Sequence, residues 1–239
     1  MEKLLDLHCH TISSGHAYSS LEEMVQGAKR NGIKIIGISD HAPSMPASTH
    51  RYFFQNLIVV PDVIDGIRVL KGVEANIIDF EGNIDMTDEE LEHLDYAIAS
   101  FHPPCIDFGD ITQNTNALLN VMKNPKVKVI GHPDDSRYPL DYEQVVKAAK
   151  ENNVALEVNN SSLNPGSFRI GAHENVATFL KLCKEHGTKV IFGSDSHVSF
   201  DVGSFHNCLE LAQKVDFPME LVINYNIDFI NDLVGKKVL

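Results

Sequence analysis

Short runs of branched apolar residues alternate with amphipathic segments along almost the whole chain. The runs lack helical spacing and predict buried strands, whereas apolar residues recur every three or four positions in the segments between them, which predicts helices. Seven strands are expected, centred on residues 4–7, 33–38, 67–73, 96–100, 127–130, 154–158 and 190–192. Helices are expected over about residues 21–30, 87–94, 112–122, 141–150, 174–185 and 204–214, with a closing helix near the C-terminal end.

Two of the predicted helices begin with a specific capping signal. Ser20 and Thr87 are each followed three residues later by a glutamate, and such pairs bond reciprocally through side chain and backbone. Asn31-Gly32 ends the first of these helices. Residues 42–60 form a long connection that we predict to be irregular, as a candidate lid or with a short helix hidden in it.

The alternation of strands and helices predicts one α/β domain over residues 1–239, with a parallel sheet covered by helices. Such a sheet either closes into a barrel or stays open. Polar residues that can bind a metal or form hydrogen bonds end every predicted strand: His8/His10, His41, Glu74, His102, His132, Asn159 and Asp195/His197. An open sheet would hold its outer strand ends far apart, whereas a closed one gathers them at one mouth. We therefore predict a (β/α)7 barrel.

Closure has a geometric consequence for two short motifs. The last strand becomes the neighbour of the first, so Asp195-Ser196-His197 should stand beside His8-Cys9-His10. Side chains two apart on a strand point the same way, so His8 and His10 project together and Cys9 faces the opposite side. His16, in the glycine-containing loop that follows, can lean over the same mouth.

This set of donors predicts a metal site. Neutral imidazoles offer nitrogen lone pairs to transition metals. A single histidine at a strand end is more often structural, and Glu74 alone could be a buried carboxylate paired with a base. Burying so many of these groups together costs several kcal/mol each unless cations balance them, and few Lys or Arg are near in sequence. The convergence therefore favours metal ions.

Composition narrows the function further. The formal net charge of −13 argues against a surface that follows nucleic-acid phosphates, and an anionic substrate would need local cations such as metal ions. The four cysteines form no C-x-x-C pair, which suits a reducing cytoplasm. We expect no signal leader and no membrane span. The remaining histidines are interpreted as surface residues: His50, His93, His173, His186 and His206.

An ordered set of motifs resembles the PHP (polymerase and histidinol phosphatase) superfamily. The motifs are His8-Cys9-His10-Thr11, Ser39-Asp40-His41, Gly72-Val73-Glu74, His102, Gly131-His132-Pro133 and Gly193-Ser194-Asp195-Ser196-His197. The longer stretches Gly72–Asn76 and Glu157–Ser162 look like its stand-alone YcdX-type phosphatases in particular. The resemblance covers nearly the whole chain.

The resemblance implies a distorted (β/α)7 barrel with a trinuclear metal site. Carried over by position, His8, His10, Glu74 and Asp195 would hold the first ion, Glu74, His102 and His132 the second, and His16, His41 and His197 the third. Glu74 would bridge the first two ions. Nitrogen and oxygen ligands suit zinc, with manganese and iron as alternatives between which the sequence does not choose.

The predicted function is a metal-dependent phosphatase that hydrolyses small phosphomonoesters with a metal-activated water and no protein nucleophile. Asp40 is a candidate partner of a ligand ring or a proton shuttle, with a strand-end cap as the alternative. Arg137 and Arg169 are candidates for binding phosphate, or else surface residues or partners of Asp134 or Asp135. The alternatives are a phosphodiesterase, an amidohydrolase or a non-catalytic metal-binding barrel. A homo-oligomer stays open.

Overall fold

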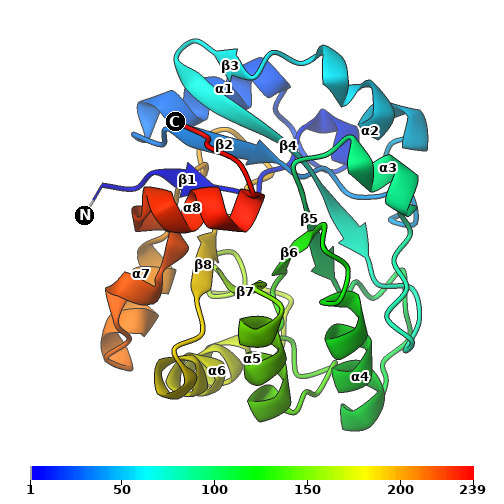
Figure 1. Cartoon of the computed structure of the whole chain (residues 1–239), viewed down its shortest axis with the longest axis vertical. Coiled ribbons are helices and arrows are strands. Elements are labelled where there is room, and N and C mark those ends of the chain that lie inside the picture. The colour runs from blue at the N-terminus through cyan, green and yellow to red at the C-terminus, as the bar shows by residue number, and fades with distance from the viewer. Residues whose placement is uncertain (1) are drawn as a thin grey trace.

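Seven parallel strands form an almost closed barrel in the computed structural model, which describes residues 2–239 (Figure 1). In order around the barrel they are β1 (Leu5–Asp6), β2 (Ile35–Ile38), β4 (Ile67–Asn76), β5 (Tyr96–Ser100), β6 (Val127–Ile130), β7 (Ala155–Asn159) and β8 (Val190–Gly193). Each pairs in parallel with the next. The predicted barrel is therefore confirmed.

One additional strand was not predicted. β3 (Val63–Ile64) pairs antiparallel with the start of β4 through a hairpin. Asp65 and Gly66 at its turn both have positive φ, 50° and 82°, as tight hairpin turns require. The Asp-Gly pair was the available sequence signal for it.

Helices surround the barrel in Figure 1. They are α1 (Leu21–Arg30), α2 (Arg51–Asn56), α3 (Asp88–Glu92), α4 (Ile111–Val121), α5 (Tyr142–Glu151), α6 (Ala172–His186), α7 (His206–Lys214) and α8 (Ile227–Val234). Both predicted capping boxes, at Ser20 and Thr87, are present. Within residues 2–239 no helix is both long and apolar enough to cross a bilayer.

The connection predicted to be irregular is only partly so. It contains the predicted short helix, α2, and a following 3-10 turn, Leu57–Val59. Phe54 and Leu57 are buried in the core between barrel and helices, which anchors this end of the connection. Its role as a lid stays a prediction.

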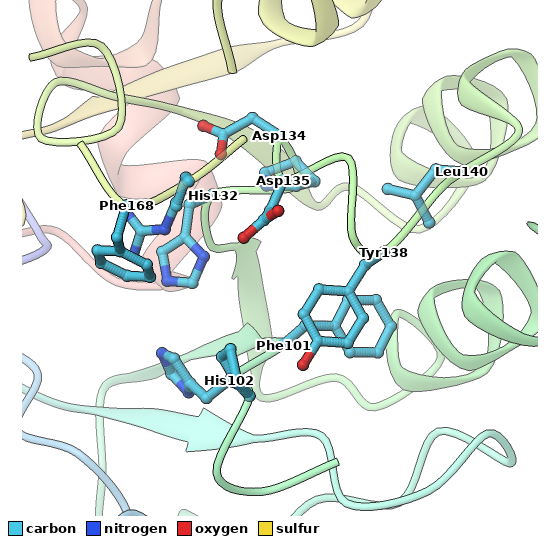
Figure 2. Close-up of a pocket in the computed structure, with 11 residues that line it drawn as sticks. Phe101, His102, His132, Asp134, Asp135, Tyr138, Leu140 and Phe168 are labelled. Carbon is cyan, nitrogen blue, oxygen red and sulfur yellow. The ribbon is translucent and has the colours of Figure 1, made fainter. Parts of the chain in front are cut away.

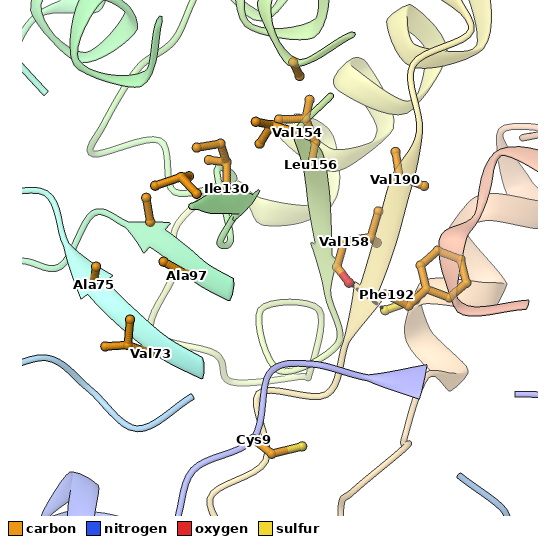
Figure 3. Close-up of a cluster of buried hydrophobic side chains, with 14 of the residues drawn as sticks. Cys9, Val73, Ala75, Ala97, Ile130, Val154, Leu156, Val158, Val190 and Phe192 are labelled. Carbon is orange, nitrogen blue, oxygen red and sulfur yellow. Dashed lines mark hydrogen bonds between the residues drawn. The ribbon is translucent and has the colours of Figure 1, made fainter. Parts of the chain in front are cut away.

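Side chains alternate between the two faces of each strand, and this alternation divides the core into two layers. One face of each strand packs outward against the helices, where Ala75, Ala97 and Val158 lie (Figure 3). The other face fills the barrel, and α8 packs against this inner cluster. Tyr96 occupies much of the interior and donates its hydroxyl to the Leu7 carbonyl at 2.6 Å.

The seam between β1 and β8 is closed without a continuous ladder. At the carboxyl end Cys9 and Ser196 form an isolated parallel bridge, with His10 N–H donating to Ser196 O at 2.9 Å. Lower down, the buried Asn224 side chain accepts from Phe192 N–H at 2.7 Å. It donates to the carbonyls of Leu5 and Phe192 at 3.0 and 2.8 Å. One side-chain amide therefore joins the first strand to the last.

We expect Asn224→Leu to lower the free energy of unfolding by about 3 kcal/mol, because it leaves buried backbone groups of both strands without partners. Urea unfolding measures this. Asn120→Leu on the exposed side of α4 is the control and should change stability by less than about 0.5 kcal/mol. Equal stability of Asn224→Leu and the parent would show that the seam does not depend on this amide.

Candidate metal centre

The nine predicted ligands meet at the carboxyl end of the barrel. They are His8, His10, His16, His41, Glu74, His102, His132, Asp195 and His197, and each lies next to at least one other of the set. His197 is half-buried and His16 is exposed at the rim, whereas the other seven are buried. Asp195-Ser196-His197 stands beside His8-Cys9-His10, as barrel closure predicts.

Glu74 lies at the centre of this group and is fully buried. It sits on the inward face of β4, so its carboxylate points across the barrel mouth. Five imidazole nitrogens approach its two oxygens at 2.8 to 3.5 Å, from His8, His102 and His132 at Oε1 and from His10 and His41 at Oε2. The charges of His8, His102 and His41 outweigh the effect of burial and hold the pKa of Glu74 well below its usual value. Glu74 is therefore an ionised acceptor in this ring of histidines.

Four atoms of the group that could bind a metal are buried and, although they lie close to one another, form no hydrogen bond of acceptable geometry: His8 Nε2, His10 Nε2, His41 Nδ1 and Glu74 Oε2. An unsatisfied buried polar atom is costly and calls for a ligand. The donors form four overlapping triads in which all ligand atoms lie within 4.8 Å of one another, and two of these triads include Glu74. Imidazole nitrogens and carboxylate oxygens at this spacing fit divalent ions. The division of the donors among ions stays a prediction.

Neighbouring groups fix the tautomers of the ligand rings. His8 Nδ1 donates to Glu157 Oε1 at 2.7 Å and His102 Nδ1 donates to Asn76 Oδ1 at 2.7 Å. His197 Nδ1 donates to the Asp195 carbonyl at 3.0 Å. In each ring this leaves Nε2 without that contact, so that in the neutral ring Nε2 carries the lone pair that binds a metal.

Glu157 and Asn76 were not among the site residues predicted from the sequence. Glu157 is buried, and the charges of Glu157, Glu74 and Asp195 together raise the pKa of His8 well above its usual value, against the lowering effect of burial. A signal existed. Asn76 lies two residues after Glu74 on the same face of β4, and Glu157 lies two before Asn159 on β7, so both point into the mouth.

Asp40 acts on a ligand ring through a hydroxyl. Ser14 Oγ donates to Asp40 at 2.7 Å, so it accepts from His10 Nδ1 at 3.0 Å. Thr11 donates to Asp40 through both its N–H and its hydroxyl, at 2.7 and 2.8 Å. Both carboxylate oxygens are thus engaged, which favours the orienting role over the proton shuttle.

The two candidate arginines differ in position. Arg137 forks onto Asp135, with Nη2 at 2.5 Å from Oδ2, and its guanidinium lies between the rings of Phe108 and Phe168. Arg169, with a side chain only 7% exposed, donates to Asp195 Oδ2 at 3.2 Å and to Ser162 Oγ at 2.9 Å. Arg169 therefore contacts Asp195, one of the nine predicted ligands. The guanidinium of Arg137 is instead occupied by Asp135, which the sequence had suggested as a possible partner.

The backbone is strained at two of the predicted ligands. His132 has φ of 30° and Asp195 has φ of 53°, values that side-chain-bearing residues rarely adopt. Such strain persists only where surrounding structure imposes it and is concentrated at functional sites. In this conformation the His132 side chain points toward Glu74, and the Asp195 side chain points toward His8.

A cavity of about 400 Å³ opens above the nine predicted ligands. Its walls combine ligands with other side chains: His16, Tyr18, His41, Met45, His102, Ser161, Phe168, Arg169, Asp195, His197, Val198 and Asp201. A much smaller pocket of about 10 Å³ adjoins it (Figure 2), between His102, His132, Asp134 and Phe168.

The other five histidines lie outside this region, in line with the sequence interpretation; His50, for example, caps α2.

Residues 6–163 match the family described as PHP domain. The chain belongs to the PHP domain family. A probable phosphatase of Acetivibrio thermocellus is 46% identical over 237 residues, covering 99% of this chain and 97% of the relative. A probable phosphatase of Clostridium novyi is 46% identical over 224 residues, covering 94% of this chain and 91% of the relative.

Solved structures of PHP-type phosphatases share the fold. Histidinol phosphate phosphatase of Lactococcus lactis, complexed with zinc, L-histidinol and phosphate, aligns with a TM-score of 0.63 at 20% identity, over 90% of this chain and 95% of that one. A putative histidinol phosphatase of Listeria monocytogenes aligns with a TM-score of 0.58 at 17% identity, over 85% of this chain and 99% of that one. These likenesses support the barrel assignment.

Glu157→Gln should weaken metal binding about 10- to 100-fold, because His8 loses the charge that fixes its ring and raises its basicity. Competition against a calibrated chelator measures the affinity. Glu185→Gln, on the exposed side of α6, is the control and should bind metal like the parent. Unchanged affinity in Glu157→Gln would rule out this supporting role.

Proposed function

We propose that the protein is a metal-dependent phosphatase acting on small phosphomonoesters. The observation that carries the proposal is the buried Glu74 carboxylate with five imidazole nitrogens around it, next to an open cavity of about 400 Å³. The open cavity matters because structural metal sites tend to be closed by protein ligands, whereas catalytic ones keep a free position. Relatives named probable phosphatases point to the same chemistry.

The proposal includes three divalent ions, with zinc first and manganese or iron as alternatives. His8, His10, Glu74 and Asp195 would hold one ion, Glu74, His102 and His132 the second, and His16, His41 and His197 the third. When bound, such ions supply a water acidic enough to attack phosphorus and positive charge against the phosphoryl oxygens. The zinc in the Lactococcus lactis histidinol phosphate phosphatase supports this choice of metal.

The remaining work falls to side chains around the mouth. In the reaction the water oxygen bonds to phosphorus, the bond from phosphorus to the ester oxygen breaks, and the departing alkoxide takes up a proton. Arg169 presents a planar set of donors beside Asp195 and binds the phosphoryl oxygens. Arg137 is a weaker candidate for this contact, since Arg169 lines the cavity of about 400 Å³ whereas Arg137 does not.

The cavity walls suggest the size and character of the substrate. Tyr18, Met45, Phe168 and Val198 give it an apolar side, and Asp201 adds an acceptor. A volume of about 400 Å³ suits a small organic molecule. The net charge of −13 disfavours a polymeric phosphate. All four cysteines are free, which agrees with the reducing cytoplasm as the compartment.

Hydrolysis of a generic aryl phosphate by the metal-loaded protein tests the function. We expect turnover with zinc, manganese or iron, and its loss after chelation, with recovery when the metal is returned. A panel of sugar and nucleotide monophosphates then ranks substrates. Absence of turnover on every monoester, with cleavage of a phosphodiester or an amide instead, would replace the proposal.

The bridging role of Glu74 has its own test. Glu74→Ala should lose more than one ion per chain and nearly all activity, because the side chain serves two ions at once. Elemental analysis counts the metal. His93→Ala, at an exposed position beyond α3, is the control and should keep both. Equal metal content in Glu74→Ala and the parent would refute bridging.

A further inference from the structure

Asp134 is a buried carboxylate that the proposed chemistry does not use. Its residue is 0% exposed, and neither of its oxygens has a hydrogen-bond partner. Its backbone is fixed, since its N–H donates to the His132 carbonyl at 2.7 Å and its carbonyl accepts from Asn175 Nδ2 at 2.7 Å. Burying such a group costs several kcal/mol unless a positive charge compensates it.

The compensating charge is that of Arg169. The two residues line the same small pocket. Figure 2 labels Asp134 there together with Phe168, the residue that precedes Arg169. Burial raises the pKa of Asp134 to about 6, and the guanidinium of Arg169 opposes that rise. The pocket's volume of about 10 Å³ holds at most about one water, so bulk solvent does not screen the pair.

The adjacent carboxylate, Asp135, is not available to balance the charge of Arg169. It accepts from Nε and Nη2 of Arg137 at 2.5 to 3.0 Å, and its pKa is lowered by Arg137 despite partial burial. Its charge is therefore already balanced. Arg169 in turn donates to Asp195 at 3.2 Å and shares the small pocket with Asp134, whose charge favours the protonated guanidinium.

Asp195 is also a proposed metal ligand, which creates a competition for its oxygens. An ion that takes up Asp195 withdraws charge from its contact with Arg169, whose side chain stays buried against Phe168 with the ring centroid 5.1 Å away. We propose that Asp134 is the counter-charge that holds Arg169 at the cavity once metal ions occupy Asp195, and so positions the guanidinium for phosphoryl oxygens. This inference rests on the proposed phosphatase function, and Asp134 is a positioning residue within it.

Binding of inorganic phosphate to the metal-loaded protein, measured by calorimetry, tests the inference. Asp134→Asn should raise the Kd about tenfold, because Arg169 is no longer held in place. In an Arg169→Met background the same substitution should have no further effect on the Kd. Asp141→Asn is the matched control, since it removes a carboxylate from the same segment while keeping a good helix cap, and its Kd should stay within about twofold of the parent.

Thermal unfolding gives a readout independent of activity. In the metal-free protein Asp195 still pairs with Arg169, and burial raises the pKa of Asp134, so Asp134→Asn should raise the Tm at neutral pH. In the metal-loaded protein the same substitution should lower the Tm, because Arg169 loses its counter-charge. A carboxylate with no such role would raise the Tm of both forms when neutralised. Asp134→Ser, neutral and smaller, repeats both measurements if the asparagine variant does not fold.

Two results would overturn the inference. One is an unchanged phosphate Kd in Asp134→Asn while Arg169→Met weakens binding. That result would keep Arg169 as a phosphate-binding residue but would exclude a role for Asp134 in positioning it. The other is a Tm change of equal size with and without metal. Turnover of aryl phosphate by the parent is measured separately, so failure of the phosphatase proposal is distinguishable from failure of this one.

Discussion

The buried carboxylate of Glu74, ringed by imidazoles, is the interaction to which the rest of the structure is fitted. A lone carboxylate would not be stable at that depth. It is tolerated because five histidine nitrogens surround it. Four atoms of this group nevertheless form no hydrogen bond within the described chain. The barrel supports this arrangement by devoting the inward face of its strands to apolar residues below and to polar residues at the mouth.

A second tier of contacts keeps the donors in place. Glu157, Asn76 and Ser14 each hold the Nδ1 side of a ring and leave the Nε2 side free. Asp40 holds Ser14, and Arg169 rests on Asp195. Charge is therefore balanced pair by pair around the mouth. Removal of one member changes the electrostatics of its neighbours rather than leaving a simple gap.

Local patterns in the sequence were sufficient for most of the fold. Apolar runs gave the seven barrel strands, and the caps at Ser20 and Thr87 gave helix starts to within a residue. The convergence of polar strand ends predicted the barrel and its ligand group. The spacing along β4 and β7 could have placed Asn76 and Glu157 at the mouth, but the partner that each supporting residue holds is remote in sequence: 149 positions separate His8 from Glu157, and 219 separate Asn224 from Leu5. No short window of sequence reveals such pairs. The partner of Arg137, Asp135, is only two residues away, whereas Arg169 reaches Asp195 at a separation of 26 positions.

The seam between the first and last strands has a consequence for how the molecule is made. Cys9 meets Ser196, and Asn224 fastens β1 to β8, so the opening residues of the chain find their neighbours only after nearly everything else has been synthesised. Domains emerge from the ribosome amino end first, at about 5 to 20 residues per second. The nascent barrel would therefore stay open along this seam during synthesis, and the histidines of the proposed metal site would come together only late in folding.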